Sequence, residues 1–326
     1  TDPADITLMG QQEAARFGYA LAVVDLNADG LDDLAVSAPR YQAASRHYTG
    51  QVFVYFGTSQ GTGLETTPSL TLTATDRNTN LGDVLAAGDL NGDGASDLVI
   101  GSPYARSGGR QRGHVTVLFS SANLSLPAQL GLGDVDVALY GEQDFDWFGG
   151  AAAVLNWGDG PYLLAGAPAY NRDDLQSVGK IYGYRGADLA AGTLEPAFTL
   201  TGDTEFDKIG SGFALADLMG GGVKTLLVSS PSATADGMKV AGEISLFDPT
   251  ALAGDLLLEN HPPDRKILSD QELSRFGWRL VTGDINNDGA DEVLATAPWR
   301  ITDPDRDAGA AYLWMGYTSP PAMPGA

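Results

Sequence analysis

The sequence predicts an all-β protein, a β-propeller built from five four-stranded blades. Three observations lead to this prediction. One pattern recurs five times along the chain, the first four copies contain four short strand-like stretches and the fifth contains three, and the 326 residues include 42 Gly and 17 Pro. Glycine and proline at this frequency are typical of many short connections rather than of long helices.

The recurring pattern is anchored by an apolar residue followed by glycine, at intervals of 61 to 67 residues. Each anchor is followed by an apolar run that ends in small residues and proline, as in Ser37-Ala38-Pro39. A fixed period of this length is the signature of a repeat architecture. The five anchors are Phe17-Gly18, Leu81-Gly82, Phe148-Gly149, Ile209-Gly210 and Phe276-Gly277.

Each copy also contains two further apolar stretches, one introduced by a small residue and one that precedes the next anchor. All of these stretches are four to seven residues long and bounded by Gly, Pro, Asn or Asp, which is typical of strands. Four strands in a repeat of about 65 residues correspond to one propeller blade. The repeat cores fall at about 17–75, 81–140, 148–201, 209–268 and 276–316.

The two ends of the chain predict how the ring closes. The fifth repeat has no fourth strand of its own, whereas residues 6–10 precede the first anchor as a fourth strand would. We expect this N-terminal strand to complete the last blade, because closure removes exposed sheet edges. Residues 1–326 would then form a single domain; the alternative is a fragment of a larger ring.

Acidic nine-residue loops separate the first two strands of repeats 1, 2 and 5. Oxygens at positions 1, 3, 5, 7 and 9, with Gly at position 6, suit Ca²⁺, which takes six to eight oxygen ligands. Position 12 is apolar and lies in a strand, which excludes an EF-hand. The predicted ligands of three Ca²⁺ ions, with carbonyls at position 7, are Asp25, Asn27, Asp29, Leu31, Asp33, Asp89, Asn91, Asp93, Ala95, Asp97, Asp284, Asn286, Asp288, Ala290 and Glu292.

The alternative for these loops is a metal-free turn in which Asp and Asn side chains bind the local backbone. Repeats 3 and 4 depart from the pattern and cannot supply five oxygens. We expect the role of Ca²⁺ to be structural, because a loop this regular holds a hairpin rather than moves one.

The Phe-Gly anchors, the Gly-Ala-Pro endings and the acidic loops between them resemble the FG-GAP repeat of integrin α-subunit propellers and of bacterial surface proteins. The resemblance covers the whole chain, strongly in repeats 1, 2 and 5 and weakly in repeats 3 and 4. It implies the propeller fold more firmly than it implies a function.

The predicted ligand-binding face lies opposite the acidic loops and holds 13 of the 19 basic residues. Aromatic residues follow the proline in four repeats, where they could hold a basic side chain or stack on a sugar. In the alternative, the aromatics cap the channel and the arginines pair with acidic neighbours. The candidate ligand-binding residues are Tyr41, Tyr104, Tyr170, Trp299 and Arg300.

The overall composition excludes several classes of binding partner. A net charge of −23 argues against nucleic acid, and the lack of a long apolar run argues against membrane insertion. No pair of the three histidines has metal-ligand spacing, and no catalytic motif has its required context. The oligomeric state is not predicted.

The function expected from these observations is a non-catalytic, calcium-stabilised adhesion module, secreted or at the cell surface, that recognises a protein partner. The alternative is a carbohydrate-binding, lectin-like propeller. A polysaccharide lyase or hydrolase has less support, so the chain is not expected to be an enzyme.

Overall fold

A computed structural model describes residues 4–43, 47–59, 63–106, 108–122, 129–131, 134–303 and 306–316. The chain divides into two compact units. The first comprises Thr1–Asn156, Gly160–Ala167 and Gly183–Pro196, and the second comprises Trp157–Asp159, Pro168–Tyr182 and Ala197–Ala326. Strands dominate, and the described helices are α1 (Gly186–Ala190) and the 3-10 turn η1 (Pro249–Ala251). The all-β prediction is therefore confirmed.

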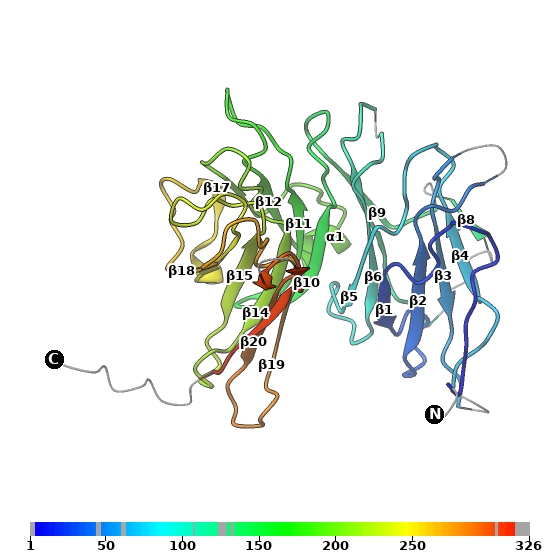
Figure 1. Cartoon of the computed structure of the whole chain (residues 1–326). Helices are drawn as coiled ribbons and strands as arrows, with labels where there is room; N and C mark the ends of the chain where they lie inside the picture. Colours follow the sequence, from blue (N-terminus) through cyan, green and yellow to red (C-terminus); the bar gives the residue numbers. More distant parts are fainter. Residues whose placement is uncertain are drawn as a thin grey trace. The chain divides into compact units, whose positions relative to one another are not determined.

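The strands of the first two repeats form two sheets (Figure 1). The first has the order β1-β2-β3-β4-β8, with β1 (Leu21–Val24), β2 (Asp33–Ala38), β3 (Gln51–Tyr55), β4 (Leu70–Thr73) and β8 (Gln129–Leu130). The second has the order β5-β6-β7-β9, with β5 (Val84–Gly88), β6 (Asp97–Ser102), β7 (His114–Leu118) and β9 (Val137–Tyr140).

The remaining repeats follow the same order of strands. The third sheet, β10-β11-β12-β13-β17, contains β10 (Ala151–Trp157), β11 (Gly160–Ala167), β12 (Lys180–Arg185), β13 (Phe198–Thr201) and β17 (Gly254–Leu257). The fourth, β14-β15-β16-β18, contains β14 (Gly212–Ala216), β15 (Thr225–Ser230), β16 (Glu243–Phe247) and β18 (Arg265–Leu268). The fifth, β19-β20-β23, contains β19 (Leu280–Gly283), β20 (Glu292–Ala297) and β23 (Ala310–Trp314).

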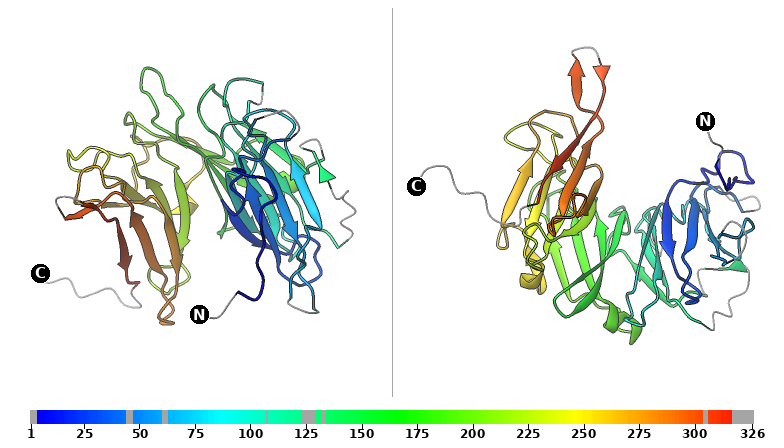
Figure 2. Two further views of the ribbon diagram at one scale, coloured as in Figure 1. Left: turned by 45° about the vertical axis from the view of Figure 1, so that its right-hand side comes forward. Right: turned by 90° about the horizontal axis from the view of Figure 1, so that it is seen from below.

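Two features add to this antiparallel pattern. The short strands β8 and β17 come from the following repeat and pair in parallel with the outer edges β4 and β13, which covers edges that would otherwise stay open. A hairpin of β21 (Ile301–Asp303) and β22 (Arg306–Asp307) extends from the fifth sheet, in orange-red (Figure 2). Five sheets for five repeats agree with the predicted count.

The predicted strand at residues 6–10 is not formed, and this expectation is corrected. The fifth sheet has three strands among the described residues, and none of them is N-terminal. The N-terminal segment is instead bound to the first repeat. Gln12 Nε2 donates to the Gln42 carbonyl at 3.1 Å, and the Gln42 N–H donates to Gln12 Oε1 at 2.7 Å. These hydrogen bonds hold the segment beside the first sheet.

The apolar core lies between successive sheets. In the first unit, Val24 and Val54 of the first sheet pack with Leu98 and Ile100 of the second, and all four are nearly inaccessible to solvent. In the second unit, Leu227 packs with Val293 around the anchor Phe276. Alternate side chains of each strand thus face the neighbouring repeat, as the short apolar stretches predict. No described helix is long and apolar enough to cross a membrane.

Neighbouring repeats are joined by one recurring backbone contact, which we call the stitch. The N–H of the anchor residue donates to the carbonyl just before the glycine that introduces the third strand of the preceding repeat. The four bonds are Leu81 to Thr49 at 3.2 Å, Phe148 to Arg112 at 3.1 Å, Ile209 to Val178 at 3.1 Å and Phe276 to Ala241 at 2.9 Å.

The stitch explains why a glycine introduces the third strand. Gly113 has a φ of +78°, a conformation that other residues adopt only with strain. A Cβ at Gly113 would also lie 2.0 Å from the Phe148 carbonyl oxygen, so the two backbones can approach only because no side chain is present. The glycine therefore sets the distance between neighbouring repeats.

Replacement of this glycine tests the stitch. We expect Gly113→Ala to lower the free energy of unfolding by roughly 3 kcal/mol or more, because strain and a backbone clash act together. Gly108→Ala is the matched control, since Gly108 has a φ of +79° but nothing within 4 Å of its Cβ position. The control should lose only about 1 kcal/mol in chemical denaturation. Equal losses in the two variants would contradict the assigned role of the stitch.

Candidate functional site

The three acidic loops lie where the sequence predicts, between the first and second strands of repeats 1, 2 and 5. Each loop begins directly after the first strand, and its ninth residue is the first residue of the second strand. In the first sheet this register pairs Val24 with Asp33. The loop therefore closes an antiparallel hairpin whose two ends are held in place by the sheet.

In the first loop, the oxygens of the first, third and fifth residues converge on the loop interior. Asp25 Oδ1 and Asn27 Oδ1 both accept the N–H of Asp29 at 3.1 Å. Asp25 Oδ2 accepts the Gly30 N–H at 3.0 Å, and Asp29 Oδ1 accepts the Leu31 N–H at 2.8 Å. The loop thus bends around its own carboxylates.

The other two acidic loops repeat this geometry. The N–H of Asp93 donates to Asp89 Oδ1 at 3.1 Å, and that of Asp288 donates to Asp284 Oδ1 at 3.0 Å. Asn91 and Asn286 accept the same N–H groups, at 2.9 Å and 2.8 Å. Equal spacing in the sequence therefore produces equal loops.

The ninth residue of each loop has a role that the sequence analysis missed. Asp33, Asp97 and Glu292 are at most 2% exposed. Asp97 Oδ2 accepts the N–H groups of Leu90 and Asn91 at 2.8 Å and 3.2 Å, whereas Oδ1 accepts the Ser120 N–H at 2.8 Å. Ser120 follows the third strand, so one carboxylate joins the loop to the end of that strand.

The ninth-position carboxylates of repeats 1 and 5 also join the acidic loop to the segment that follows the third strand. Asp33 accepts the Leu26 N–H at 3.0 Å and the Gly57 N–H at 2.8 Å, and burial raises its pKa to about 6. Glu292 accepts the N–H groups of Ile285 at 2.9 Å and Gly316 at 3.3 Å. The only feature of the sequence that could have indicated this structural role is a carboxylate at a constant distance from the start of the loop. Metal binding explains the same feature.

The donor atoms of each acidic loop are of the chemical type that Ca²⁺ binds. They are carboxylate, amide and carbonyl oxygens, which are the hard ligands that Ca²⁺ takes in proteins. Among the described residues, no three His, Cys, Asp or Glu side chains gather closely enough to hold a metal by themselves. Calcium in the first loop would therefore need the Asn27 side chain and the Leu31 carbonyl in addition to the carboxylates.

Repeats 3 and 4 close their hairpins in other ways. In the third sheet, β10 ends at Trp157 and β11 begins at Gly160, so only Gly158 and Asp159 lie between the strands. In the fourth repeat, Asp217 accepts the N–H groups of Gly221 and Gly222 at 3.2 Å and 2.5 Å. The two-residue turn of the third repeat has no room for the acidic pattern, whereas the fourth repeat keeps a loop of residues 217–224 that is held by one carboxylate.

The four predicted aromatic residues do not occupy equivalent positions. The carbonyls of Tyr41 and Tyr170 accept the N–H of the stitch glycines Gly50 and Gly179, at 3.1 Å and 3.2 Å. In the second and fifth repeats, Ala105 and Arg300 accept the corresponding bonds at 2.9 Å and 3.0 Å. Tyr104 and Trp299 therefore lie one position earlier.

Nearby side chains contact Tyr170, Trp299 and Arg300 among the candidate ligand-binding residues. Lys180 Nζ lies 4.9 Å from the centroid of the Tyr170 ring. Trp299 packs edge-on against Trp278 with ring centroids 4.8 Å apart. Arg300 forms an ion pair with Asp270, in which Nη2 donates to Oδ2 at 3.2 Å. The positive charge of Arg300 is thus balanced.

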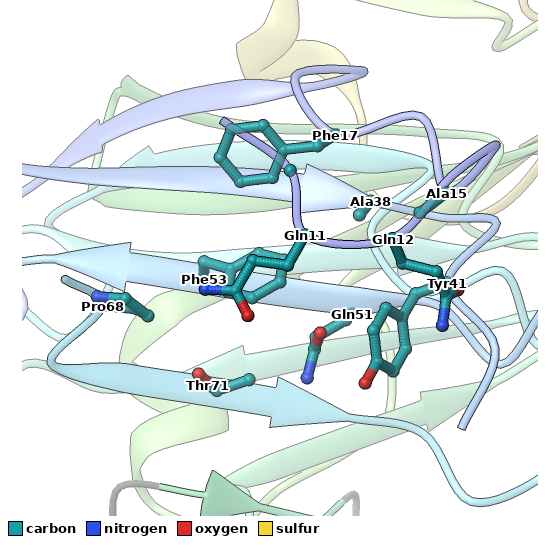
Figure 3. Close-up of a pocket in the computed structure, with 11 residues that line it drawn as sticks. Gln11, Gln12, Ala15, Phe17, Ala38, Tyr41, Gln51, Phe53, Pro68 and Thr71 are labelled. Atoms are coloured by element: carbon teal, nitrogen blue, oxygen red, sulfur yellow. The ribbon is translucent and has the colours of Figure 1, made fainter. Parts of the chain in front are cut away.

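Tyr41 lines a cavity of about 380 Å³ on the first sheet (Figure 3). The side chains of Tyr41, Gln51 and Thr71 point toward one another, and Phe53 closes one end. Gln51 Nε2 donates to Thr73 Oγ1 at 2.8 Å, which orients the amide. The cavity is neutral and lies beside the N-terminal segment, which contributes Gln11 and Gln12.

Tyr104 lines a second cavity, of about 190 Å³, in which two cationic side chains meet two aromatic rings. It is formed by the loop between β6 and β7 and by the segments that precede the second and third anchors. The six lining residues are Asn78, Tyr104, Arg106, Arg110, Gln111 and Phe145. Sequence reasoning placed Tyr104 and the arginines on this face but did not bring them together.

The buried carboxylate at the ninth position can be tested without metal. In excess EDTA, we expect Asp97→Ala to lower the free energy of unfolding by about 2 to 4 kcal/mol, because three N–H groups lose their acceptor. Asp93→Ala is the control, since Asp93 lies in the same loop but is exposed. Its loss should stay below about 1 kcal/mol in urea denaturation. If Asp93→Ala were as costly, the ninth position would have no special structural role.

Comparison with known proteins identifies the repeats and their relatives. Residues 17–55, 81–118 and 276–314 match the FG-GAP repeat family. A stretch of 113 residues is 40% identical to integrin alpha-5 of Xenopus laevis and covers 33% of this chain and 10% of that protein. The family match falls in repeats 1, 2 and 5, where the resemblance was predicted to be strong.

Two relatives extend over nearly the whole chain. Phosphatidylinositol-glycan-specific phospholipase D of Bos taurus is 36% identical over 95% of this chain and 38% of its own length. The enzyme of the same name from Homo sapiens is 36% identical over 91% of this chain and 36% of its own length. The chain thus spans less than two fifths of the length of these relatives.

These relatives correct the functional expectation. The predictions that the chain is a non-catalytic adhesion module and that it is not an enzyme are wrong, because the relatives that align over more than nine tenths of the chain carry the name of a phospholipase D. The physical reason is that the repeat pattern encodes strands and turns, which unrelated activities share. What the anchors, the stitch and the family match establish together is that this chain contains FG-GAP repeats, at residues 17–55, 81–118 and 276–314.

Proposed function

We propose that this chain is the FG-GAP repeat region of an enzyme of the phosphatidylinositol-glycan-specific phospholipase D type, which works outside the cell or at its surface. The observation that carries the proposal is the 36% identity over 95% of the chain to an enzyme of that name. The part of the activity assigned to this chain is recognition of the glycan portion of the substrate.

Two features of the chain support glycan recognition. The loops that precede the third strands present Tyr41 and Tyr104 at cavities, and both cavities also contain amide side chains. Aromatic rings together with a few directed polar groups are typical of sites for small polar ligands. An acidic surface with a net charge of −23 also disfavours nucleic acid as the ligand.

The activity can be tested with the longer protein that contains this chain. We expect it to release a glycan-anchored protein from detergent micelles and to leave phosphatidic acid, because a phospholipase D breaks the bond between phosphate and head group. Phosphatidylinositol without a glycan should be cleaved at least 10-fold more slowly. The measurement is the kcat/KM for the two substrates. Equal rates, or no release, would contradict the proposal.

We further propose that Ca²⁺ binds the acidic loops of repeats 1, 2 and 5 and stabilises their hairpins. The support is the equal geometry of the three loops and their oxygen donor set. Neutralisation by Ca²⁺ would reduce the repulsion among Asp25, Asp29 and Asp33, which lie in one nine-residue loop. Binding to the folded state alone adds about 2.7 kcal/mol per site when Ca²⁺ is 100-fold above its Kd.

Thermal melting tests calcium binding. We expect EDTA to lower the midpoint by about 5 °C or more relative to excess Ca²⁺, because three sites lose their ligand together. Asp93→Asn should reduce this difference, whereas Asp159→Asn, in the short third hairpin, should leave it unchanged. An equal midpoint with EDTA and with Ca²⁺ would refute the proposal, as would an equal effect of the two variants.

A further inference from the structure

We propose that the Tyr104 cavity binds a phosphate-bearing sugar or cyclitol, with Arg106 and Arg110 on the phosphate and Tyr104 and Phe145 on the ring. This inference rests on the proposed function and deepens it, because it names one recognition site and the chemical class of its ligand. The site lies entirely within the first compact unit.

The cations of the cavity are available to a ligand. Arg106 and Arg110 are exposed, and neither guanidinium forms an ion pair with a carboxylate in the part of the chain that the structure describes. A guanidinium presents paired N–H donors that match the oxygens of a phosphate. Two such groups at one small cavity provide the donors that a phosphate dianion requires.

The comparable loops of the third and fifth repeats already contain ion pairs. In the third repeat, Arg172 Nη2 lies 3.3 Å from Glu259 Oε2, and in the fifth repeat Arg300 pairs with Asp270. In the second repeat, Asp144 Oδ1 accepts Arg112 Nε at 2.9 Å, and this hydrogen bond lowers the pKa of Asp144, with a smaller contribution from the charge of Arg110. The Tyr104 cavity therefore presents two exposed guanidinium groups beside a carboxylate that already pairs with Arg112, on a chain that is otherwise strongly acidic.

The backbone holds the cationic loop in place. The Arg110 N–H donates to Asp144 Oδ1 at 3.1 Å, and the Phe145 N–H donates to the Arg110 carbonyl at 2.8 Å. The stitch between Phe148 and Arg112 follows directly. Because Asp144 and Phe145 already hold the backbone of this loop at Arg110, the loop loses little conformational entropy when a ligand binds, which favours a preformed site.

The aromatic rings are oriented for a sugar. Tyr104 packs edge-on against Trp147 with ring centroids 6.1 Å apart, which fixes its plane. Phe145 is 47% exposed and has a left-handed backbone with a φ of +68°. The same left-handed position is filled by Ala14, Asn78, Phe206 and Leu273 in the other repeats, so the fold does not require an aromatic ring there.

An exposed aromatic ring beside two arginines offers a face for the C–H groups of a sugar and a border of polar donors. Asn78 adds an amide that can bind a hydroxyl. The volume of about 190 Å³ is smaller than the roughly 300 to 1,000 Å³ of sites for drug-sized ligands. The cavity therefore suits one phosphorylated ring, rather than a whole glycan.

Calorimetric titration of the 326-residue chain tests the site. The probes are myo-inositol 1-phosphate, myo-inositol and inorganic phosphate. We expect the first to bind at least 10-fold more tightly than either of the others, because only it engages the arginines and the rings together. Equal affinity for inorganic phosphate would reduce the site to an anion site and overturn the assignment of a sugar.

Variants separate the parts of the site. Arg106→Gln with Arg110→Gln should weaken binding of myo-inositol 1-phosphate at least 10-fold, and Tyr104→Ala should weaken it while leaving the weak binding of inorganic phosphate unchanged. Arg265→Gln, in the exposed strand β18, controls for the loss of charge and should bind as the parent does. Unchanged melting midpoints exclude unfolding as the cause. Binding that survives the double change would overturn the proposal.

The test is independent of the proposed function. If the longer protein releases anchored proteins but the chain binds no phosphorylated ring, the phospholipase proposal stands and the site is refuted. If the chain binds the probe but the longer protein has no such activity, the site stands and the phospholipase proposal is refuted.

Discussion

The structure depends on one contact, the stitch between an anchor residue and the carbonyl before a left-handed glycine of the preceding repeat. Four such hydrogen bonds, of 2.9 to 3.2 Å, join successive repeats. The residues just before each anchor also adopt left-handed conformations, as at Phe145 and Trp147. Because the backbones meet without side chains between them, the loops above the sheets are brought into register, and the Tyr104 cavity forms at one of these junctions.

The buried carboxylate of the acidic loops solves a related problem at the other end of the sheets. Asp97 accepts three backbone N–H groups from two different segments, so the loop and the third strand are held even before any metal is considered. The half-buried Asp89 and the exposed Asp93 accept backbone N–H groups of the loop itself. The acidic pattern thus has two roles. The ninth residue closes the hairpin, and the other residues, as proposed, bind the metal.

Much of the fold could be predicted because it is local. The boundaries of strands such as β2 and β6 follow from short, continuous apolar runs and from flanking Gly, Asp and Pro, and the loops begin where the acidic pattern begins. The destination of residues 6–10 could not be predicted in this way. The pattern of five residues indicates that the stretch can form a strand, but it does not indicate which sheet edge the stretch would pair with. In the structure, the two hydrogen bonds between Gln12 and Gln42 hold the N-terminal segment at the first repeat.

The sequence by itself determined the five repeats, the order of their first three strands, and which loops carry the acidic pattern, because periodicity, turn residues and charge are local properties. Only the tertiary structure decided which arginines are balanced and which aromatics share a position. Arg300 meets Asp270 across 30 residues, and Arg112 meets Asp144 across 32. Such pairs depend on the stitch that brings loops of successive repeats together, a distance in space that no local pattern encodes.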